Sequence, residues 1–394
     1  MFDRALGSCP CARRWSTCLT VAAALLTVMS GCTRESPPAP PAATSEPGVR
    51  LTWLGEFTRP AGAVYPTLLD SARFGELSGL VRDDESGQWI AVVDDRETRV
   101  AWLTIGYANN TLTVTPTRLM PLRAGAGVSA RTVTQADLEA IVALPDGTFL
   151  MTEEGHVTGA DVWQPVILHA TRDGVVTDTI NYPSTFDIQP NQGRGLRPNQ
   201  GFESLTRLPN GHLVAGLEQP LLEDGDTASF GHGGRARLIE LVQDNQVWRA
   251  GRQWTYEIEP TPRVAGFDAT CGDGGGTGLV ELLSLTDTTL LSLERSCIQN
   301  PQTQATMNPT QIFSVMLDGT EARKALVLDL GTLVPRLSPA LRNLDNFEGM
   351  SFGPPSPDGG ATILVVSDDN FRNTQRTAFL LFSIAGMSPA VTAR

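Results

Sequence analysis

Five internal repeats constrain the fold of this chain more than any other feature of its sequence. Each repeat has a short apolar strand, a turn with Asp, Asn, Gly or Pro, and a second apolar strand that ends in an acidic residue, which is the pattern of a β-hairpin. Two further strands follow in most repeats, and four strands per repeat are typical of a β-propeller blade. The hairpins span residues 74–96, 136–155, 199–219, 278–296 and 345–370.

The two ends of the repeat pattern predict how the ring closes. The fifth repeat has only three strands, the last over residues 377–384, whereas an unassigned strand over residues 51–57 precedes the first repeat. Pairing these two strands leaves no exposed sheet edge. We therefore predict an all-β fold, a β-propeller of five four-stranded blades in which the N-terminal strand closes the last blade. The alternative is six blades, with one hidden in the connections over residues 184–199 or 260–278.

The N-terminal segment predicts export and lipid attachment. Arg13 and Arg14 precede an apolar run over residues 21–28, and small residues then lead to Cys32. This layout is typical of a secretory signal and resembles a bacterial lipoprotein signal, in which the cysteine becomes the acylated first residue. We predict a signal peptide over residues 1–31 and a lipid on Cys32. An ordinary cleaved signal or a short membrane anchor is the alternative.

The rest of the chain is predicted to be a tethered domain outside the cytoplasm. Residues 32–48 are rich in Pro and Ala and favour an extended tether, and the propeller domain follows over residues 49–394. A formal net charge of −13 argues against nucleic acid or an anionic membrane surface as a partner, because both attract positively charged proteins. We expect a monomer in the cell envelope (periplasm/outer membrane or cell surface) that is held to the membrane by its lipid alone.

Two cysteines remain in the predicted domain once those of the signal and Cys32 are set aside. They are Cys271 and Cys297. In an oxidising compartment these two residues are candidates for one disulfide. Two separate buried thiols are the alternative.

Acidic residues recur at two positions of the repeat, near the start of the first strand and at the end of the second. In an antiparallel hairpin these two positions lie at the same end. We therefore predict that the acids from all repeats face one opening of the central channel and are candidate metal ligands. They are Asp94, Glu139, Glu153, Glu203, Glu218, Glu281, Glu294, Glu348 and Asp368.

Carboxylates that converge in this way repel one another, which raises their pKa values unless a cation or arginines neutralise them. Calcium takes 6–8 oxygen ligands in flexible geometry, so we predict calcium at this opening, with another divalent cation as an alternative. The acids have a second interpretation, as caps for backbone N–H groups of adjoining turns. Arg96, Arg295 and Arg372 follow the acids closely in sequence and are candidates to bind phosphate. Their alternative role is in salt bridges that balance the acids.

Several repeat motifs resemble the bacterial "esterase-like activity of phytase" family. The most specific pieces are NQGFE at residues 199–203, NFEG at residues 346–349 and SDDNF at residues 367–371, and the resemblance spans about residues 51–384. It implies a propeller related to calcium-dependent phytases, in which calcium ions held by acids at the propeller mouth bind substrate phosphates and activate water. The cluster of basic residues that cradles phosphates in true phytases is not evident in this sequence.

Three functions are compatible with these features. The first is metal-assisted hydrolysis of a phosphoester or another small anionic ester, in which Asp or Glu side chains act as ligands and general base. The second is a calcium-stabilised propeller without catalysis that binds a glycan, an envelope component or a protein. The third is a lactonase-like hydrolase, in which a single metal ion opens a sugar ester. The sequence leaves the catalytic residues unassigned.

Overall fold

The computed structural model of this chain describes residues 48–68, 73–94, 97–134, 136–189, 192–272 and 276–386. These residues belong to the larger of two compact units, Glu46–Arg394. The predicted signal peptide, the lipidation site at Cys32 and most of the tether lie outside the described residues. In the part of the chain that is described, no helix is both long enough and apolar enough to cross a bilayer.

The described residues are almost entirely β-structure, as the repeats predict. Their helical segments are α1 (Ala130–Thr134) and four 3₁₀ turns, η2 (Ser184–Phe186), η3 (Leu222–Asp224), η4 (Leu330–Leu333) and η5 (Pro339–Leu341). Short strands lie in the connections, namely β2 (Ala63–Val64), β3 (Arg73–Phe74), β8 (Arg123–Ala124), β11 (Val157–Thr158), β12 (Asp161–Val162), β15 (Ile188–Gln189), β16 (Arg194–Gly195), β21 (Ala269–Thr270), β24 (Ile298–Gln299) and β25 (Thr306–Met307).

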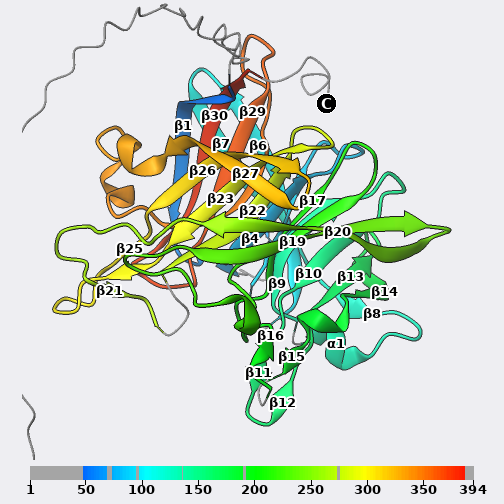
Figure 1. Ribbon diagram of the computed structural model, residues 1–394. Helices are drawn as coiled ribbons and strands as arrows, with labels where there is room; N and C mark the ends of the chain where they lie inside the picture. Colours follow the sequence, from blue (N-terminus) through cyan, green and yellow to red (C-terminus); the bar gives the residue numbers. More distant parts are fainter. Residues whose placement is uncertain are drawn as a thin grey trace, which may run out of the picture. The chain divides into compact units, whose positions relative to one another are not determined.

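The longer strands form antiparallel meanders of four, which we number as blades 1 to 5 (Figure 1). Blade 1 has β4 (Leu77–Arg82), β5 (Trp89–Val93), β6 (Arg99–Ala108) and β7 (Thr111–Pro121). Blade 2 has β9 (Leu138–Ala143), β10 (Phe149–Glu153), β13 (Val166–Ala170) and β14 (Val175–Asn181). Blade 3 has β17 (Phe202–Arg207), β18 (Leu213–Leu217), β19 (Gly234–Asp244) and β20 (Val247–Ile258). Blade 4 has β22 (Thr277–Ser284), β23 (Thr289–Ser296), β26 (Thr310–Asp318) and β27 (Glu321–Asp329), and blade 5 has β28 (Asn346–Phe352), β29 (Thr362–Asp368), β30 (Arg376–Ala385) and β1 (Arg50–Pro60).

The N-terminal strand completes the last blade, as predicted. β1 pairs antiparallel with β30 from Arg50 opposite Ala385 to Pro60 opposite Arg376, and Figure 1 shows the blue β1 beside the red β30. The first strands of the blades contact one another in a closed cycle, in the order β4, β9, β17, β22, β28 and back to β4. Because each first strand touches two others, the five surround one axis, which is the arrangement of a β-propeller.

The blades pack against one another through apolar side chains on both faces of their inner strands. Every residue of β5, β10 and β18 is buried, which explains why the second strand of each repeat reads as an apolar run rather than an alternating one. Between blades 2 and 3, the Phe202 ring stacks on the Tyr182 ring with centroids 3.7 Å apart. Blades 3 and 4 are also joined at their outer edges, where β20 and β27 pair in parallel.

Candidate functional site

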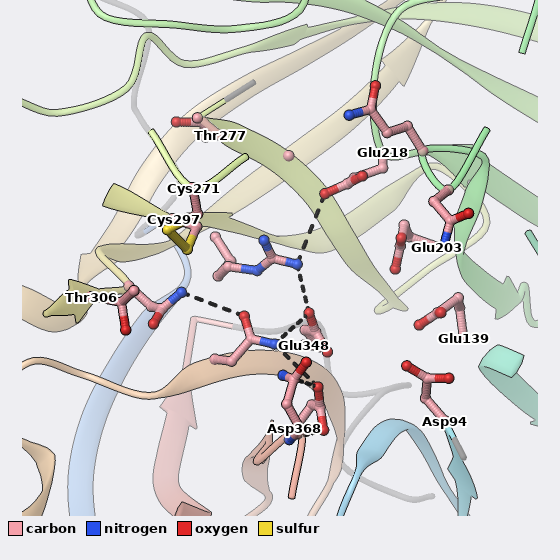
Figure 2. Close-up of a pocket in the computed structure, with 18 of the residues that line it drawn as sticks. Asp94, Glu139, Glu203, Glu218, Cys271, Thr277, Cys297, Thr306, Glu348 and Asp368 are labelled. Carbon is pink, nitrogen blue, oxygen red and sulfur yellow. Dashed lines mark hydrogen bonds and ion pairs between the residues drawn. A yellow bond between two sulfur atoms is a disulfide. The ribbon is translucent and has the colours of Figure 1, made fainter. Parts of the chain in front are cut away.

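One end of the central channel opens into a polar pocket of about 290 Å³. It lies where the first strands of the blades begin and the second strands end. Six acids and two arginines stand among its described lining residues, as Figure 2 illustrates in part. The acids are Asp94, Glu139, Glu203, Glu218, Glu348 and Asp368, and the arginines are Arg295 and Arg372.

A β-bulge near the start of each first strand turns one side chain toward this opening. The pairing of first and second strands is interrupted at this position in all five blades, and a bulge re-aims the side chain that it carries. In blades 2, 3 and 5 the interrupted stretch contains Glu139, Glu203 and Glu348, which line the pocket. A β-bulge at the same position of each blade therefore orients these three acids toward the opening.

The end of the second strand supplies the other ring of side chains, and here the register corrects the sequence alignment. Opposite the residue that precedes the bulge of the first strand lies Glu153 in blade 2, paired with Leu138, and Glu294 in blade 4, paired with Leu279. The residue that turns toward the opening is the next one along, because side chains alternate along a strand. In chain order these residues are Asp94, Glu154, Glu218, Arg295 and Asp368.

Glu153 and Glu294 therefore do not line the pocket, contrary to the prediction. Glu153 Oε1 lies 3.2 Å from His156 Nδ1. Glu294 is buried between blades 3 and 4, where it accepts a hydrogen bond of 2.7 Å from the Tyr256 hydroxyl and pairs with Lys324. Both carboxylates thus have a partner on the opposite faces of their strands, although Glu153 Oε2 has none among the described residues.

Glu281 is the third departure from the predicted ring. It lies opposite Leu293, just beyond the bulge of β22, so it occupies a different register position from Glu203. Its Oε1 accepts a hydrogen bond of 2.9 Å from the Leu282 N–H, and the carboxyl lines a separate cavity along the channel. Glu281 matches the alternative in which a repeat acid caps backbone amides.

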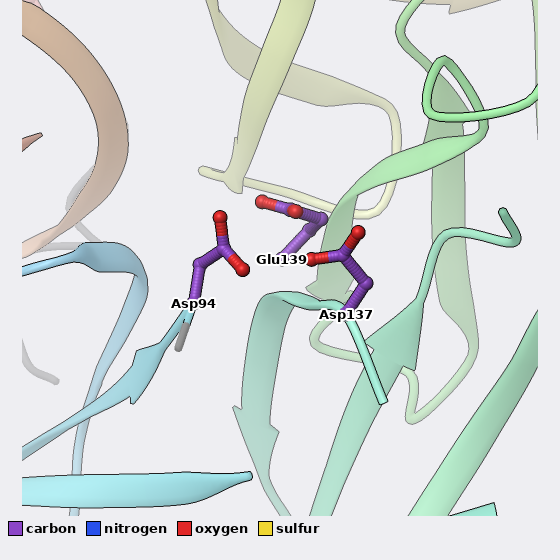
Figure 3. Close-up of side chains that lie close together, drawn as sticks. All are labelled: Asp94, Asp137 and Glu139. Carbon is purple, nitrogen blue, oxygen red and sulfur yellow. The ribbon is translucent and has the colours of Figure 1, made fainter. Parts of the chain in front are cut away.

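Two acids that the sequence analysis missed, Asp137 and Glu154, join the pocket acids. One carboxylate oxygen from each of Asp94, Asp137 and Glu139 lies within 4.8 Å of the others, and Figure 3 shows these three side chains pointing toward one another. One carboxylate oxygen from each of Glu139, Glu154 and Glu203 likewise lies within 4.8 Å of the others. We call these five residues the acid cluster. The alternation of Asp137, Leu138 and Glu139 was a signal that both acids share one face.

Burial and mutual repulsion raise the pKa values of carboxyls in the acid cluster. Burial and the neighbouring Asp137 raise the pKa of Asp94 to about 10. Burial, with Glu203 and Asp94 next in effect, raises the pKa of Glu139 well above its usual range. Among the described residues, no backbone amide donates a hydrogen bond to the carboxylates of Asp94, Glu139 or Glu203.

The acid cluster fits a hard divalent cation. All of its donor atoms are carboxylate oxygens, the ligand type that calcium and magnesium prefer. A cation would relieve the repulsion that raises their pKa values, and each group of the acid cluster offers three carboxylate oxygens to one ion. The residues present therefore fit a divalent metal ion in the type of ligand that they offer.

The arginines of the pocket have two different environments. Arg295 Nη2 lies 2.5 Å from Glu348 Oε1 and 3.8 Å from Glu218 Oε1, so this guanidinium balances two acids, which was the alternative role for the arginines. Its Nε is enclosed and has no hydrogen-bond partner among the described residues. Arg372 lines the pocket and forms no ion pair with a described residue. Arg96 lies outside the described residues.

Arg295 also lowers the pKa values of its neighbours Glu218 and Glu348, against the larger effect of burial. Burial raises the pKa of Glu218 to about 7, with Arg295 opposing that increase. Burial likewise raises the pKa of Glu348, and Arg295 again opposes it. Burial, followed by the charge of Glu348, raises the pKa of Asp368 well above its usual range, although Asp368 Oδ1 accepts a hydrogen bond of 2.8 Å from the Asn370 N–H.

A disulfide forms part of the pocket wall. Cys271 and Cys297 are bonded, with their Cα atoms 5.3 Å apart, and both line the pocket. The Cys271 N–H donates to the Cys297 carbonyl at 3.1 Å. In Figure 2 the disulfide and Thr306 lie on one side, and Asp94, Glu139 and Glu203 lie on the other. The bond thus ties the start of β22 and the end of β23 to a wall that faces the acid cluster.

Comparisons with known proteins give one family match and several remote structural likenesses. The family model described as "Phytase-like: Esterase-like activity of phytase" matches residues 72–371. No curated protein matches the sequence.

Three solved structures illustrate the remote likenesses. An endo-arabinase from Bacteroides thetaiotaomicron has a TM-score of 0.46 at 12% identity, covering 84% of this chain and 98% of the other. An α-L-arabinanase from Penicillium chrysogenum, solved with arabinobiose, scores 0.41 at 13% identity, with 79% and 80% covered. A gluconolactonase from Xanthomonas campestris scores 0.38 at 9% identity, with 90% and 99% covered. At such scores and identities, these likenesses support no inference about activity or substrate.

Proposed function

Because the chain belongs to the phytase-like family, we propose that it is a metal-assisted hydrolase of a small anionic ester, with calcium as the metal and a phosphate monoester as the substrate. The observation that carries this proposal is the acid cluster, in which Asp94, Asp137 and Glu139 bring three carboxylate oxygens within 4.8 Å of one another beside a pocket. Such a cluster favours a divalent cation over any neutral ligand.

In this proposal the two sides of the pocket have separate tasks. The acid cluster holds the cation, which when bound supplies Lewis acidity and lowers the pKa of water. Arg372 and the free Nε of Arg295 donate hydrogen bonds to the anionic group of the substrate. A pocket carboxylate accepts a proton from the attacking water, whose oxygen forms the new bond to phosphorus while the bond to the alcohol oxygen breaks. The proton on the carboxylate then passes to the alkoxide, which leaves as the alcohol.

The cellular context is part of the same proposal. The signal-like segment and Cys32 support a lipoprotein of the cell envelope, which acts as a monomer on a small anionic substrate and contacts the membrane through its lipid. The excess of acidic residues supports a cation as cofactor and gives no support to a nucleic-acid partner.

The test is hydrolysis of p-nitrophenyl phosphate by the purified protein, with calcium or with a chelator. We expect turnover that the chelator abolishes and calcium restores, and at least a hundredfold loss in the double variant Asp94→Asn, Glu139→Gln. The matched control is Glu257→Gln, a glutamate on β20 whose side chain is 59% exposed, which leaves turnover unchanged.

Calcium binding without turnover of this ester would contradict the proposal. The non-catalytic alternative predicts that outcome, because it needs the cation only to hold the pocket acids together. Turnover of a sugar lactone but not of the phosphoester would instead favour the lactonase-like alternative.

A further inference from the structure

The wall of the pocket formed by blade 5 differs chemically from the acid cluster. The connection between β29 and β30, residues 369–375, contributes the side chains of Asn370, Arg372 and Gln375 to the pocket lining. Asn346 from β28 and Asn308 from the connection before β26 lie in the same lining. Beside the carboxylates of Glu348 and Asp368, which also line the pocket from blade 5, this wall presents four carboxamides, which bind hydroxyl groups, and one guanidinium.

The carboxamide of Gln375 has no hydrogen-bond partner among the described residues. Gln375 is 8% exposed, and its Oε1 is enclosed. Leaving a buried amide group unpaired costs about 1–3 kcal/mol, so such a group in a native pocket calls for a partner that is bound there. Asn346, by contrast, donates through Nδ2 to Glu348 at 2.9 Å.

The backbone around Gln375 is fixed. The Gln375 N–H donates to the Arg372 carbonyl at 2.9 Å, and the Arg372 N–H donates to the Asp369 carbonyl at 2.8 Å. The buried Asp369 carboxylate accepts hydrogen bonds from the Glu76 N–H at 3.1 Å and the Thr377 hydroxyl at 2.6 Å. Arg372 and Gln375 therefore stand at the two ends of one anchored turn, which presents a positive charge beside a free carboxamide.

The charge balance of the pocket limits what this turn can recognise. Six acids and two arginines stand among the described lining residues, and Arg295 already balances two of the acids. With one divalent cation in the acid cluster, the cation and the two arginines supply four positive charges against six carboxylates, so a ligand with many negative groups is still disfavoured. A hydroxyl, which both donates and accepts, satisfies the carboxamide in either orientation.

From these observations we infer that the alcohol part of the substrate is a polyol with free hydroxyl groups, that it bears a single anionic ester, and that Gln375 binds one of its hydroxyls while Arg372 binds the ester anion. The inference rests on the proposed function and deepens it. It assigns Gln375 as the residue that determines specificity, and it excludes fully phosphorylated polyols as good substrates.

The experiment compares kcat/KM for glycerol 3-phosphate and n-propyl phosphate, which share a carbon skeleton and differ by two hydroxyls. We expect the wild type to favour glycerol 3-phosphate about tenfold, the size of one net hydrogen bond. In Gln375→Leu the ratio falls to about one, because kcat/KM for glycerol 3-phosphate falls about tenfold. Inositol hexakisphosphate is a poorer substrate than inositol monophosphate.

Two controls separate a loss of substrate recognition from misfolding. The first is the variant Gln375→Asn, which keeps a shorter carboxamide, and the second is the thermal midpoint of each variant. A wild-type ratio near one, or an unchanged ratio in a folded Gln375→Leu variant, overturns the inference while leaving the proposed function intact. If neither ester is hydrolysed, the proposed function fails. Calorimetric binding of the two esters in calcium then tests the inference, and equal affinities overturn it.

Discussion

Replacing Glu139 by glutamine should stabilise the metal-free protein and abolish most of its stabilisation by calcium. Glu139 belongs to both groups of the acid cluster, in which carboxylate oxygens lie within 4.8 Å of one another. At an effective dielectric constant of about 20, two unit charges at that separation repel by roughly 3.5 kcal/mol. Protonation relieves part of this repulsion, so we expect the glutamine variant to gain about 2 kcal/mol at pH 8 in the presence of a chelator.

The sign of the pH dependence follows from the direction of the shift. The pKa of Glu139 is raised above its ordinary value of 4.5 in the folded protein, so the folded state binds more protons than the unfolded state above that pH. The stability of the metal-free wild type therefore falls as pH rises from 4.5, and the advantage of Glu139→Gln is lost as pH falls toward 4.5. Calcium at one hundred times its Kd adds about 2.7 kcal/mol to the wild type.

Differential scanning calorimetry at pH 8 and pH 5, with chelator or calcium, measures both effects. The matched control is Glu281→Gln, because Glu281 is also a buried channel glutamate but accepts a hydrogen bond from the Leu282 N–H. This control removes no member of the acid cluster, so calcium should raise its midpoint by as much as it raises that of the wild type. A lower midpoint for Glu139→Gln in chelator, together with the full wild-type shift in calcium, would refute the reasoning.

Three further perturbations test the ion pairs and the disulfide. Arg295→Met leaves Glu348 buried without its partner and should lower the free energy of unfolding in urea by about 3–5 kcal/mol. An unchanged urea midpoint would contradict the stabilising role of this ion pair. Lys324→Met should cost a similar amount by leaving Glu294 unpaired between blades 3 and 4, and equal stability with the wild type would contradict that role. Replacing both disulfide cysteines by serine should lower the free energy of unfolding by about 3.5 kcal/mol, since the bond joins residues 26 apart. An unchanged thermal midpoint would contradict a stabilising role of the disulfide.

The architecture was predictable because its signals are local. Apolar hairpins with Asn-Gly or Asp-Gly turns repeat along the sequence, and the missing fourth strand of the last repeat matches the extra strand at the N-terminus. The need to cover exposed sheet edges then determines the pairing of β1 with β30, which the register confirms.

The position of individual acids was harder to predict because one residue decides which face a side chain occupies. In the pair Glu153-Glu154, the sequence gives no reason to prefer the second residue, yet only Glu154 joins the acid cluster. In the pair Glu294-Arg295, the alignment of acid with acid selects Glu294, whereas the register turns Arg295 toward the pocket.

The β-bulges and the contacts between blades have no local signature. Glu281 looks equivalent to Glu203 by sequence, but the bulge of β22 places it one position further along the strand. The unpaired carboxamide of Gln375 depends on neighbours from distant parts of the chain, so only the folded structure identifies it.

The most direct test of the account is a crystal structure of the protein grown with calcium, with anomalous scattering used to locate the ion. We predict an anomalous peak 2.3–2.6 Å from carboxylate oxygens of the acid cluster, including Asp94, Asp137 and Glu139. An acid cluster without such a peak, with its carboxylates instead bonded to one another through shared protons, would contradict the account.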